Sequence, residues 1–280
     1  MKYGKLLLLA NGLLLLAACA STTKIKDVKP LTTNAPLLQS PEEEKLLIRS
    51  KRTHEELVDK GLIVRHKGAN EYIAKLAKRI SPEFSHPKIK LNFYILKDAS
   101  VNASALPNGN IYLNVGLIAK LQSEDQLSFV MAHEVAHVIE RHGLKRNIDR
   151  KKSIASSHVA NLLLMGTNVI YYATLNDLAS FSRETEDEAD FEGMKLLAQS
   201  GLNIHEGMEA IIRLKQVKHA KEGSSAWSSH DTIANRSNTY QQRIEANNWQ
   251  QLSAAPKTSD YQIFRTALAE QVIKIRLRNK

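Results

Sequence analysis

The stretch from Ser123 to Gly143, SEDQLSFVMAHEVAHVIERHG, is the part of the sequence that decides the predicted fold. Ser123 and Gln126 form a Ser-x-x-Gln capping box, which satisfies free backbone N–H groups at the start of a helix. The residues that follow are apolar over a wide arc, so we expect this helix to be buried. Gly143 predicts an end near His142, because glycine commonly terminates helices.

This helix carries the motif HExxH at residues 133–137. His133 and His137 are four residues apart, so their imidazoles project from one side about one turn apart. That spacing allows both rings to bind one Zn²⁺ ion. Glu134 is rotated by about 100° from His133, and we expect it to act as the base on a water that the metal activates. The alternative, two core histidines bonded to backbone carbonyls, is disfavoured because polar rings on an apolar helix need partners.

A zinc site of this kind requires a third protein ligand. Some zinc peptidases place a histidine six residues after the second histidine, but this chain has Gly143 there. His142 lies about 140° around the predicted helix from His137, so we expect it not to face the same metal. The sequence therefore predicts a carboxylate ligand from another helix.

The acidic stretch ETEDEAD, residues 184–190, supplies the candidates. On a helical wheel, Glu186 and Asp190 continue into a stripe of apolar residues and face the core, whereas Glu188 lies on the opposite side and is expected to be solvated. Two inward carboxylates one turn apart are unfavourable without a cation. We therefore predict Glu186 as the third ligand and Asp190 as the acceptor for the second N–H of a ligating histidine. Arg183, one turn before Glu186, is expected to help neutralise the pair.

Residues 1–18 have the features of a signal peptide, with two lysines before an apolar run that is too short for a membrane span. The run leads into LAAC at residues 16–19, which resembles a bacterial lipobox and makes Cys19 the predicted lipidation site. The alternative is a plain signal peptide or short anchor with an incidental cysteine. No Asp follows Cys19, a pattern that resembles outer-membrane sorting. Residues 19–44 are rich in Ser, Thr, Pro and Asn and are predicted to form a flexible tether.

The composition is that of an ordinary globular protein: 280 residues, 43% hydrophobic and 24% charged. The formal net charge of +10 suits an anionic surface. Aromatic residues are few and are not interleaved with the Lys and Arg residues, so a membrane surface is favoured over nucleic acid, and no nucleic-acid partner is expected.

The length fits one medium domain, which we place at residues 45–250, followed by a C-terminal basic extension at 251–280. Strand patterns within 88–98 and at 111–115 flank an Asn-Gly turn, so these two flanks are candidates for pairing. The apolar run at 159–175 is predicted to be a core helix, with a membrane-touching or lid segment as the alternative. Most other patterns are helical, so we expect an α+β fold that is mainly helical with a small β-sheet.

Together these motifs resemble the gluzincin metallopeptidases of the HtpX heat-shock protease and CAAX prenyl protease (Ste-type) family, and most of all its periplasmic lipoprotein branch of the LoiP and BepA kind. The family's HExxH, Arg-His, Ser-Arg and E-x-x-A-D-x-x-G elements correspond here to residues 133–137, 141–142, 182–183 and 186–193. The resemblance covers about residues 45–250. It implies a zincin-like fold with a buried HExxH helix, and one Zn²⁺ held by His133, His137 and Glu186.

A further family element is Ser-x-His-Pro, followed by an arginine six residues after the histidine. In this chain Ser228, His230 and Arg236 match, and Asp231 replaces the proline. The resemblance implies that His230 lies near the metal, where it would stabilise an oxyanion or block the open coordination position. The alternative is a surface histidine in a Ser-rich loop.

The function that the resemblance implies is that of a zinc endopeptidase, an outer-membrane lipoprotein that faces the periplasm and cleaves unfolded or misassembled envelope proteins. The main alternative is a non-proteolytic chaperone or assembly factor for outer-membrane proteins that uses the same cleft. The intact Glu134 disfavours it. A purely structural zinc site is disfavoured because three protein ligands leave a fourth position open.

Overall fold

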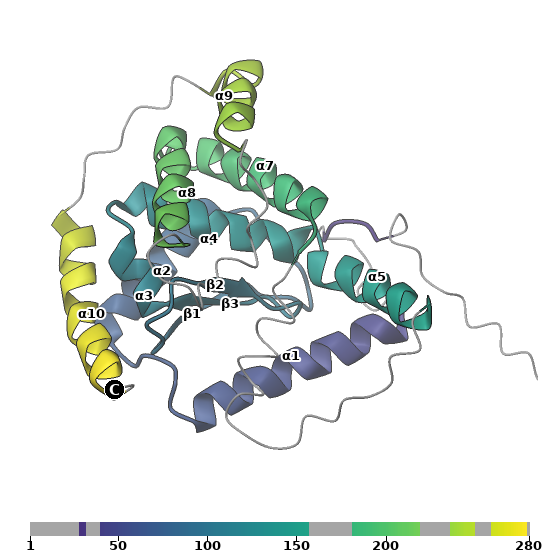
Figure 1. The fold of residues 1–280 in the computed structure, drawn as a ribbon, viewed down its shortest axis with the longest axis horizontal. Coiled ribbons are helices and arrows are strands. Elements are labelled where there is room, and N and C mark those ends of the chain that lie inside the picture. The colour runs from purple at the N-terminus through teal and green to yellow at the C-terminus, as the bar shows by residue number, and fades with distance from the viewer. Residues whose placement is uncertain (1–27, 32–39, 157–180, 219–235, 250–258, 279–280) are drawn as a thin grey trace, which may run out of the picture.

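The computed structural model describes residues 28–31, 40–156, 181–218, 236–249 and 259–278 (Figure 1). The predicted helix at 159–175 lies outside these residues. In the ranges described, no helix combines the length and the apolar character that crossing a bilayer requires. The elements follow one another as α1 (Pro41–Asp59), α2 (Lys67–Ile80), β1 (Asn92–Leu96), β2 (Ala103–Ala105), β3 (Asn110–Asn114), α3 (Val115–Lys120), α4 (Glu124–Ile139), α5 (His142–Ser156), α7 (Arg183–Gln199), α8 (Ile204–Lys218), α9 (Arg236–Ala246) and α10 (Ser259–Arg278).

The fold is mainly helical around a small mixed sheet of three strands in the order β1-β3-β2. The two predicted strands pair in parallel, with Asn92 opposite Asn110. The short strand β2 pairs with β3 in the antiparallel sense. The Asn-Gly turn joins β2 to β3, and Gly109 adopts a φ of 87° there. A Cβ on Gly109 would lie 2.3 Å from the carbonyl oxygen of Lys90, so both the turn and the neighbouring backbone require glycine.

The sheet separates two hydrophobic clusters, because alternate side chains of β3 point to opposite faces. Ile111 and Leu113 belong to the larger cluster, which includes α4. Tyr112 points to the other face, where α1 covers the sheet (Figure 1) and His54 Nδ1 lies 3.0 Å from the tyrosine hydroxyl. The sheet is therefore buried on both sides.

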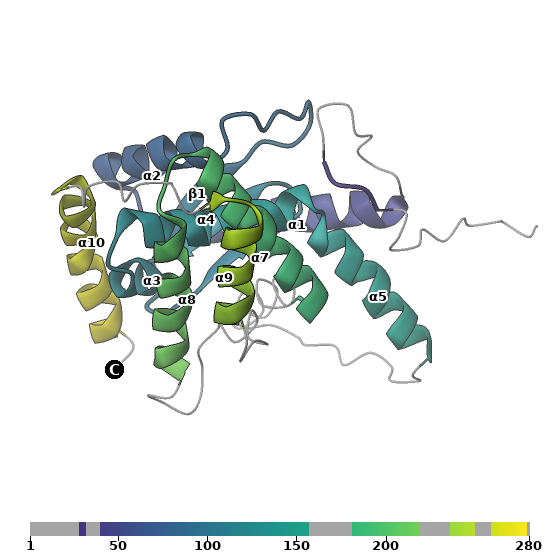
Figure 2. The same ribbon diagram turned by 90° about the horizontal axis from the view of Figure 1, so that it is seen from above.

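The HExxH helix α4 is the centre of the molecule, and α7 and α8 pack directly on it (Figures 1 and 2). Every residue of α4 from Asp125 to Val138 is buried, as the apolar arc predicted. Ser123 caps the helix by accepting a hydrogen bond from the backbone N–H of Gln126, as the capping box predicted. Gly193 of α7 lets the two helix backbones approach, since a Cβ there would lie 3.1 Å from the backbone nitrogen of His133.

The C-terminal helix α10 packs against α2 and α3. Tyr261, Phe264 and Leu268 join the main cluster, and the Tyr261 hydroxyl donates to the carbonyl oxygen of Leu121 at 3.3 Å. The residues expected as a basic extension thus include a helix that shares the core of the domain.

The end of α4 differs from the prediction. The helix stops at Ile139 with Glu140 as its C-cap, and a new helix starts at His142. The chain turns at Arg141, which has a φ of 55° although it is not glycine. Gly143 serves another purpose, because a Cβ there would lie 2.8 Å from Cγ of Pro107. The glycine that we interpreted as a helix terminator therefore permits a close contact instead.

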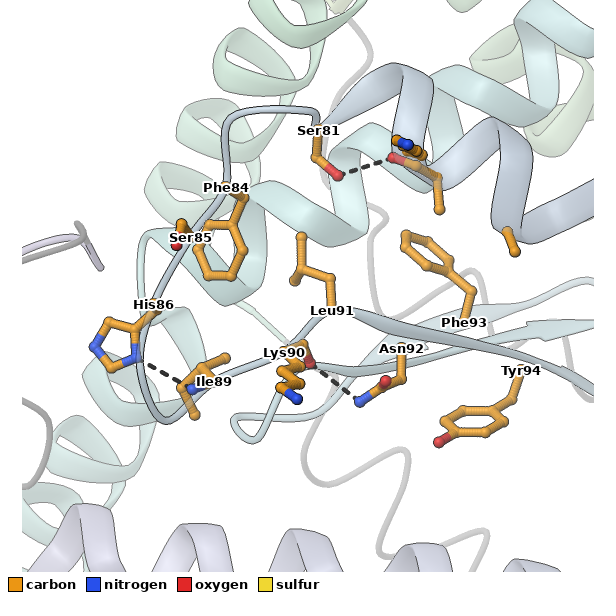
Figure 3. Close-up of a pocket in the computed structure, with 13 residues that line it drawn as sticks. Ser81, Phe84, Ser85, His86, Ile89, Lys90, Leu91, Asn92, Phe93 and Tyr94 are labelled. Atoms are coloured by element: carbon orange, nitrogen blue, oxygen red, sulfur yellow. Dashed lines mark hydrogen bonds between the residues drawn. The ribbon is translucent and has the colours of Figure 1, made fainter.

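A groove of about 580 Å³ lies between the second half of α2, the 81–91 loop and the start of β1 (Figure 3). Its loop is fixed locally, because the backbone N–H of Ile89 donates to His86 Nδ1 at 3.1 Å and the Asn92 amide donates to the carbonyl oxygen of Lys90 at 3.2 Å. No residue of the HExxH motif lines this groove. It is therefore separate from the candidate site described next.

Candidate metal centre

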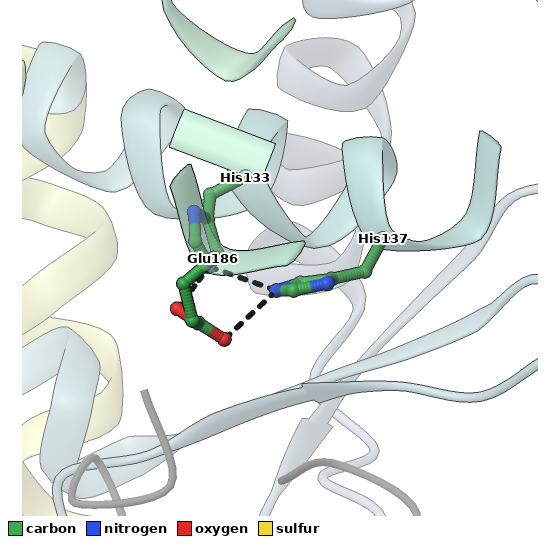
Figure 4. A group of neighbouring side chains, drawn as sticks. All are labelled: His133, His137 and Glu186. Carbon is green, nitrogen blue, oxygen red and sulfur yellow. Dashed lines mark hydrogen bonds and ion pairs between the residues drawn. The ribbon is translucent and has the colours of Figure 1, made fainter. Parts of the chain in front are cut away.

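Three predicted ligands converge at one buried point between α4 and α7 (Figure 4). The Nε2 atoms of His133 and His137 are 3.0 Å apart. The Glu186 carboxylate places Oε2 3.5 Å from His133 Nε2 and Oε1 3.5 Å from His137 Nε2. One ligand atom from each residue can be chosen so that all three lie within 4.8 Å of one another. Glu186, which the helical wheel selected as the third ligand, thus lies in one group with the two histidines.

The donor set fits a divalent metal. Two imidazole nitrogens and one carboxylate oxygen are a known ligand set for catalytic zinc, which keeps a further position open. All three side chains are at most 2% exposed, and a buried carboxylate is strongly unfavourable without compensating charge. A cation bound between these three groups would provide that charge.

The carboxylates of Asp190 and Glu186 favour a positive charge on the His133 ring, and a bound metal ion would replace that charge. Burial alone would lower the pKa of His133, but the hydrogen bonds and charges of Asp190 and Glu186 outweigh it and raise this pKa to about 10. The two carboxylates therefore favour a second proton on the ring when no metal is bound. Because a ligating imidazole must be neutral, metal binding here releases a proton.

The second nitrogen of His133 faces a carboxylate directly. His133 Nδ1 lies 3.0 Å from Oδ1 of Asp190, and both side chains are buried. Asp190 stands on α7 one turn after Glu186, so one helix supplies both the ligand and the acceptor. This is the contact that the inward stripe of α7 predicted. A carboxylate on the free nitrogen fixes the ring and raises its basicity as a ligand.

The second nitrogen of His137 faces another histidine. His137 Nδ1 is 2.7 Å from Nδ1 of His142, whose Nε2 is 3.0 Å from Oε2 of Glu188. Lys145 Nζ donates to the same carboxylate oxygen at 3.0 Å. On its other side, the His137 ring stacks on Phe181 with 3.9 Å between centroids.

Our expectations for His142 and Glu188 were wrong in part. The wheel placed His142 away from His137 because it assumed that α4 continues, whereas the turn at Arg141 brings the two rings together. His142 is indeed not among the grouped metal ligands. Glu188, expected in solvent, is only partly exposed and holds His142 and Lys145. No local sequence pattern predicts the turn at Arg141, because its ion-pair partner, Glu43, lies about a hundred residues earlier in the chain. The two side chains are 2.5 Å apart.

The surroundings keep His142 neutral. Burial, together with the nearby charge of His137, lowers the pKa of His142 to about 3. Burial opposes ionisation of Glu188, but the hydrogen bonds from His142 and Lys145 prevail and lower its pKa. Burial and the Glu188 charge raise the pKa of Glu140 to about 7. The end of this hydrogen-bonded chain is therefore a neutral imidazole on an ionised carboxylate.

The other predicted site residues have different outcomes. Glu134 is fully buried on α4, next to His133. Arg183 is exposed at the start of α7, and among the described ion pairs none joins it to Glu186 or Asp190. Cys19 and His230 lie outside the described residues, and Arg236 begins α9 with its side chain outside the description.

Comparison with known proteins agrees with this geometry. Residues 67–244, more than half of the chain, match the model of Peptidase family M48. A mitochondrial metalloendopeptidase OMA1 of Schizosaccharomyces pombe is 30% identical over 131 residues, which are 46% of this chain and 39% of the relative. A beta-barrel assembly-enhancing protease of Escherichia coli is 29% identical over 148 residues, 48% of this chain and 30% of the relative. The match thus spans about a third of the length of these relatives. By its family match and its His-His-Glu group, the chain belongs to Peptidase family M48.

Proposed function

We propose that this chain is a zinc-dependent endopeptidase that cleaves unfolded or misassembled proteins of the cell envelope. The observation that carries the proposal is the convergence of His133, His137 and Glu186 at one buried point. The intact Glu134, inside the same motif, adds the acid–base group that hydrolysis requires. Imidazole and carboxylate donors favour zinc over the hard cations, which prefer oxygen ligands alone.

Each residue has a distinct role in this proposal. Zinc, when bound, would polarise the substrate carbonyl and make a water more acidic. Glu134 takes the proton from the attacking water and passes it to the leaving amine. His133, His137 and Glu186 would hold the metal, and Asp190 keeps the His133 ring in place. His230 would assist the oxyanion and Arg236 would support that loop, as the family resemblance implies.

The substrate class and the location rest on the sequence and on the relatives' names. One relative is named for beta-barrel assembly, which supports envelope proteins as substrates. We place the active chain at the outer membrane, facing the periplasm, with residues 1–18 removed, Cys19 lipidated and residues 19–44 as a tether to a domain at 45–250. Replacement of Cys19 by Ser should release the protein from the membrane fraction. Unchanged membrane association of that variant would contradict the lipid anchor.

The Glu134→Gln variant tests the peptidase. It should bind one zinc per chain and unfold at the wild-type temperature, yet cleave an unfolded casein roughly 10²- to 10⁴-fold more slowly, because the base is lost. Glu192→Gln, an acid on α7 that is paired with Lys195, is the control and should cleave normally. Undiminished cleavage by Glu134→Gln would remove Glu134 from the mechanism. Zinc-loaded wild-type protein without any cleavage would favour the chaperone alternative.

A further inference from the structure

The two ligating imidazoles have their second nitrogens in different surroundings. His133 meets Asp190 directly. His137 meets His142, and His142 meets Glu188. We propose that His142 and Glu188 are positioning residues for the metal centre and form a directed relay of hydrogen bonds that fixes the orientation of His137. This inference rests on the proposed function, because it concerns how a bound zinc is held.

The direction of the relay follows from the ligand atoms. His137 Nε2 faces His133 and Glu186, so it is the nitrogen that would bind the metal. A neutral imidazole that ligates through Nε2 carries its proton on Nδ1. His137 Nδ1 must therefore donate to Nδ1 of His142, 2.7 Å away.

The same reasoning fixes the second bond. If His142 accepts at Nδ1, its own proton is on Nε2, which lies 3.0 Å from Oε2 of Glu188. An ionised carboxylate only accepts hydrogen bonds, so Glu188 completes the direction. Lys145 donates to the same oxygen at 3.0 Å and holds the carboxylate in position. Each donor in the relay then faces an acceptor.

Packing restricts the rings as well as the protons. Phe181 stacks on the His137 ring at an interplanar angle of 15°, and His142 is fully buried. The His137 and His142 rings meet edge to face, with 4.9 Å between centroids. The relay therefore leads from a buried ligand to Glu188, whose side chain is 42% exposed. It is a path by which a carboxylate at the surface influences the metal ligand.

Zinc affinity is the main measurement, by competition with a chromophoric chelator, on the full chain. Glu188→Ala removes the final acceptor and should weaken zinc binding about tenfold, the lower end of the effect of removing such partners. Glu192→Ala is the matched control, because Glu192 is on the same helix and also binds a lysine at 3.0 Å. It should bind zinc within about twofold of wild type, since its lysine partner is Lys195 rather than Lys145 of the relay.

Two His142 variants test the middle of the relay. His142→Phe fills the space without an acceptor and should weaken zinc binding roughly 10- to 100-fold. His142→Asn restores an oxygen that can accept from His137 and should recover part of that loss. Thermal unfolding of the metal-free variants serves as the check on folding. Equal zinc affinity of Glu188→Ala and Glu192→Ala, or wild-type affinity of His142→Phe, would overturn the relay.

The tautomers can be measured directly by ¹⁵N–¹H correlation spectra of the imidazoles in the zinc-loaded protein. The relay requires a proton on Nδ1 of His137 and on Nε2 of His142. A proton on Nδ1 of His142 would reverse the direction and overturn the inference even if every variant lost zinc. A wild-type chain that binds no zinc would overturn the proposed function, and the relay with it, whereas equal binding by all variants would overturn the relay alone.

Discussion

The two histidines of the HExxH motif occupy adjacent turns of one helix but are held in opposite ways. His133 is fixed by Asp190, which is 1% exposed and comes from α7, the helix that also carries Glu186. His137 is fixed by His142 and, through it, by Glu188 near the surface. The contact of His133 with Asp190 is direct and buried, whereas the contacts from His137 through His142 to Glu188 cross the junction between α4 and α5. We therefore expect zinc affinity to depend more on the contact of His133 with Asp190 than on the contacts that extend from His137 to Glu188.

The largest effect should come from Arg141, which supports only the His137 side. Its guanidinium pairs with Glu43 at 2.5 Å, and both side chains are almost completely buried. Arg141→Ala leaves a buried carboxylate without its partner, which costs about 3–5 kcal/mol. Unfolding in urea should show this loss, together with weaker zinc binding as His142 shifts.

Arg79→Ala is the control for Arg141. Arg79 pairs with Glu124 at 3.2 Å, but its side chain is 39% exposed, so the loss should stay below about 1 kcal/mol. If the two arginine variants were equally stable, the junction would not depend on the Arg141 pair.

The next effect concerns the enclosed side. Asp190→Ala leaves a buried imidazole N–H without its acceptor, which costs about 1–3 kcal/mol, and zinc affinity should fall by roughly 100-fold. Asp187→Ala is the matched control on the same helix, because Asp187 is 50% exposed and pairs with Arg243 at the surface. Zinc titration and urea unfolding together check both values. A loss of affinity smaller than that of Glu188→Ala would reverse the ranking of the two sides.

The enclosed side also depends on a close approach of two backbones. A Cβ on Gly193 would lie 3.1 Å from the nitrogen and 3.2 Å from Cα of His133, so Gly193→Ala pushes α7 away from α4. We expect a loss of about 1–2 kcal/mol, which in a domain of this size lowers the melting temperature by roughly 2–8 °C.

Gly68→Ala in α2 is the control for Gly193. The nearest atom to its added Cβ would be 3.8 Å away, so the change should leave stability unchanged or slightly improved, since alanine favours helix. A melting temperature of Gly193→Ala that matches that of Gly68→Ala would show that α7 can move without cost, contrary to an enclosed and rigid His133 side.

The His133 side of the site could be predicted from the sequence better than the His137 side. Glu186 and Asp190 lie on one regular helix, so periodicity alone selected them over Glu188. The ligand spacing of His133 and His137 is likewise a property of a single helix. The mainly helical fold with a small sheet followed from local patterns of the same kind.

The His137 side could not be predicted because it depends on contacts between distant residues. The end of α4 is set by a left-handed Arg141, and its partner Glu43 belongs to α1. Helix propensities do not account for a contact between distant residues, and Gly143 is a residue type that commonly ends a helix. One misplaced helix end was enough to rotate His142 away from His137 in the prediction.

The smallest predicted effect concerns the surface end of the relay, where Glu140 and Glu188 share one ammonium, Lys145, at 3.8 Å and 3.0 Å. Burial, then the charge of Glu188, raise the pKa of Glu140 to about 7 from an ordinary value of 4.5. A carboxyl whose pKa is raised by folding contributes stability that is complete below pH 4.5 and is lost as the pH rises through 7. In Glu140→Gln this side chain does not ionise, so the variant does not lose this stability as the pH rises.

The melting temperature of Glu140→Gln relative to wild type should therefore rise between pH 5 and pH 8. After allowance for screening by solvent and by the nearby Lys145, we expect about 1 kcal/mol, or roughly 2–4 °C. Glu71→Gln should show no such trend, because Glu71 is 66% exposed and pairs with Lys67 on α2, away from Glu140. If the difference in melting temperature between Glu140→Gln and wild type stayed constant with pH, the charge of Glu188 would not affect the ionisation of Glu140. Glu188 would then not share Lys145 with a second charged carboxylate. The orientation of His137 would in that case be fixed as strongly as that of His133.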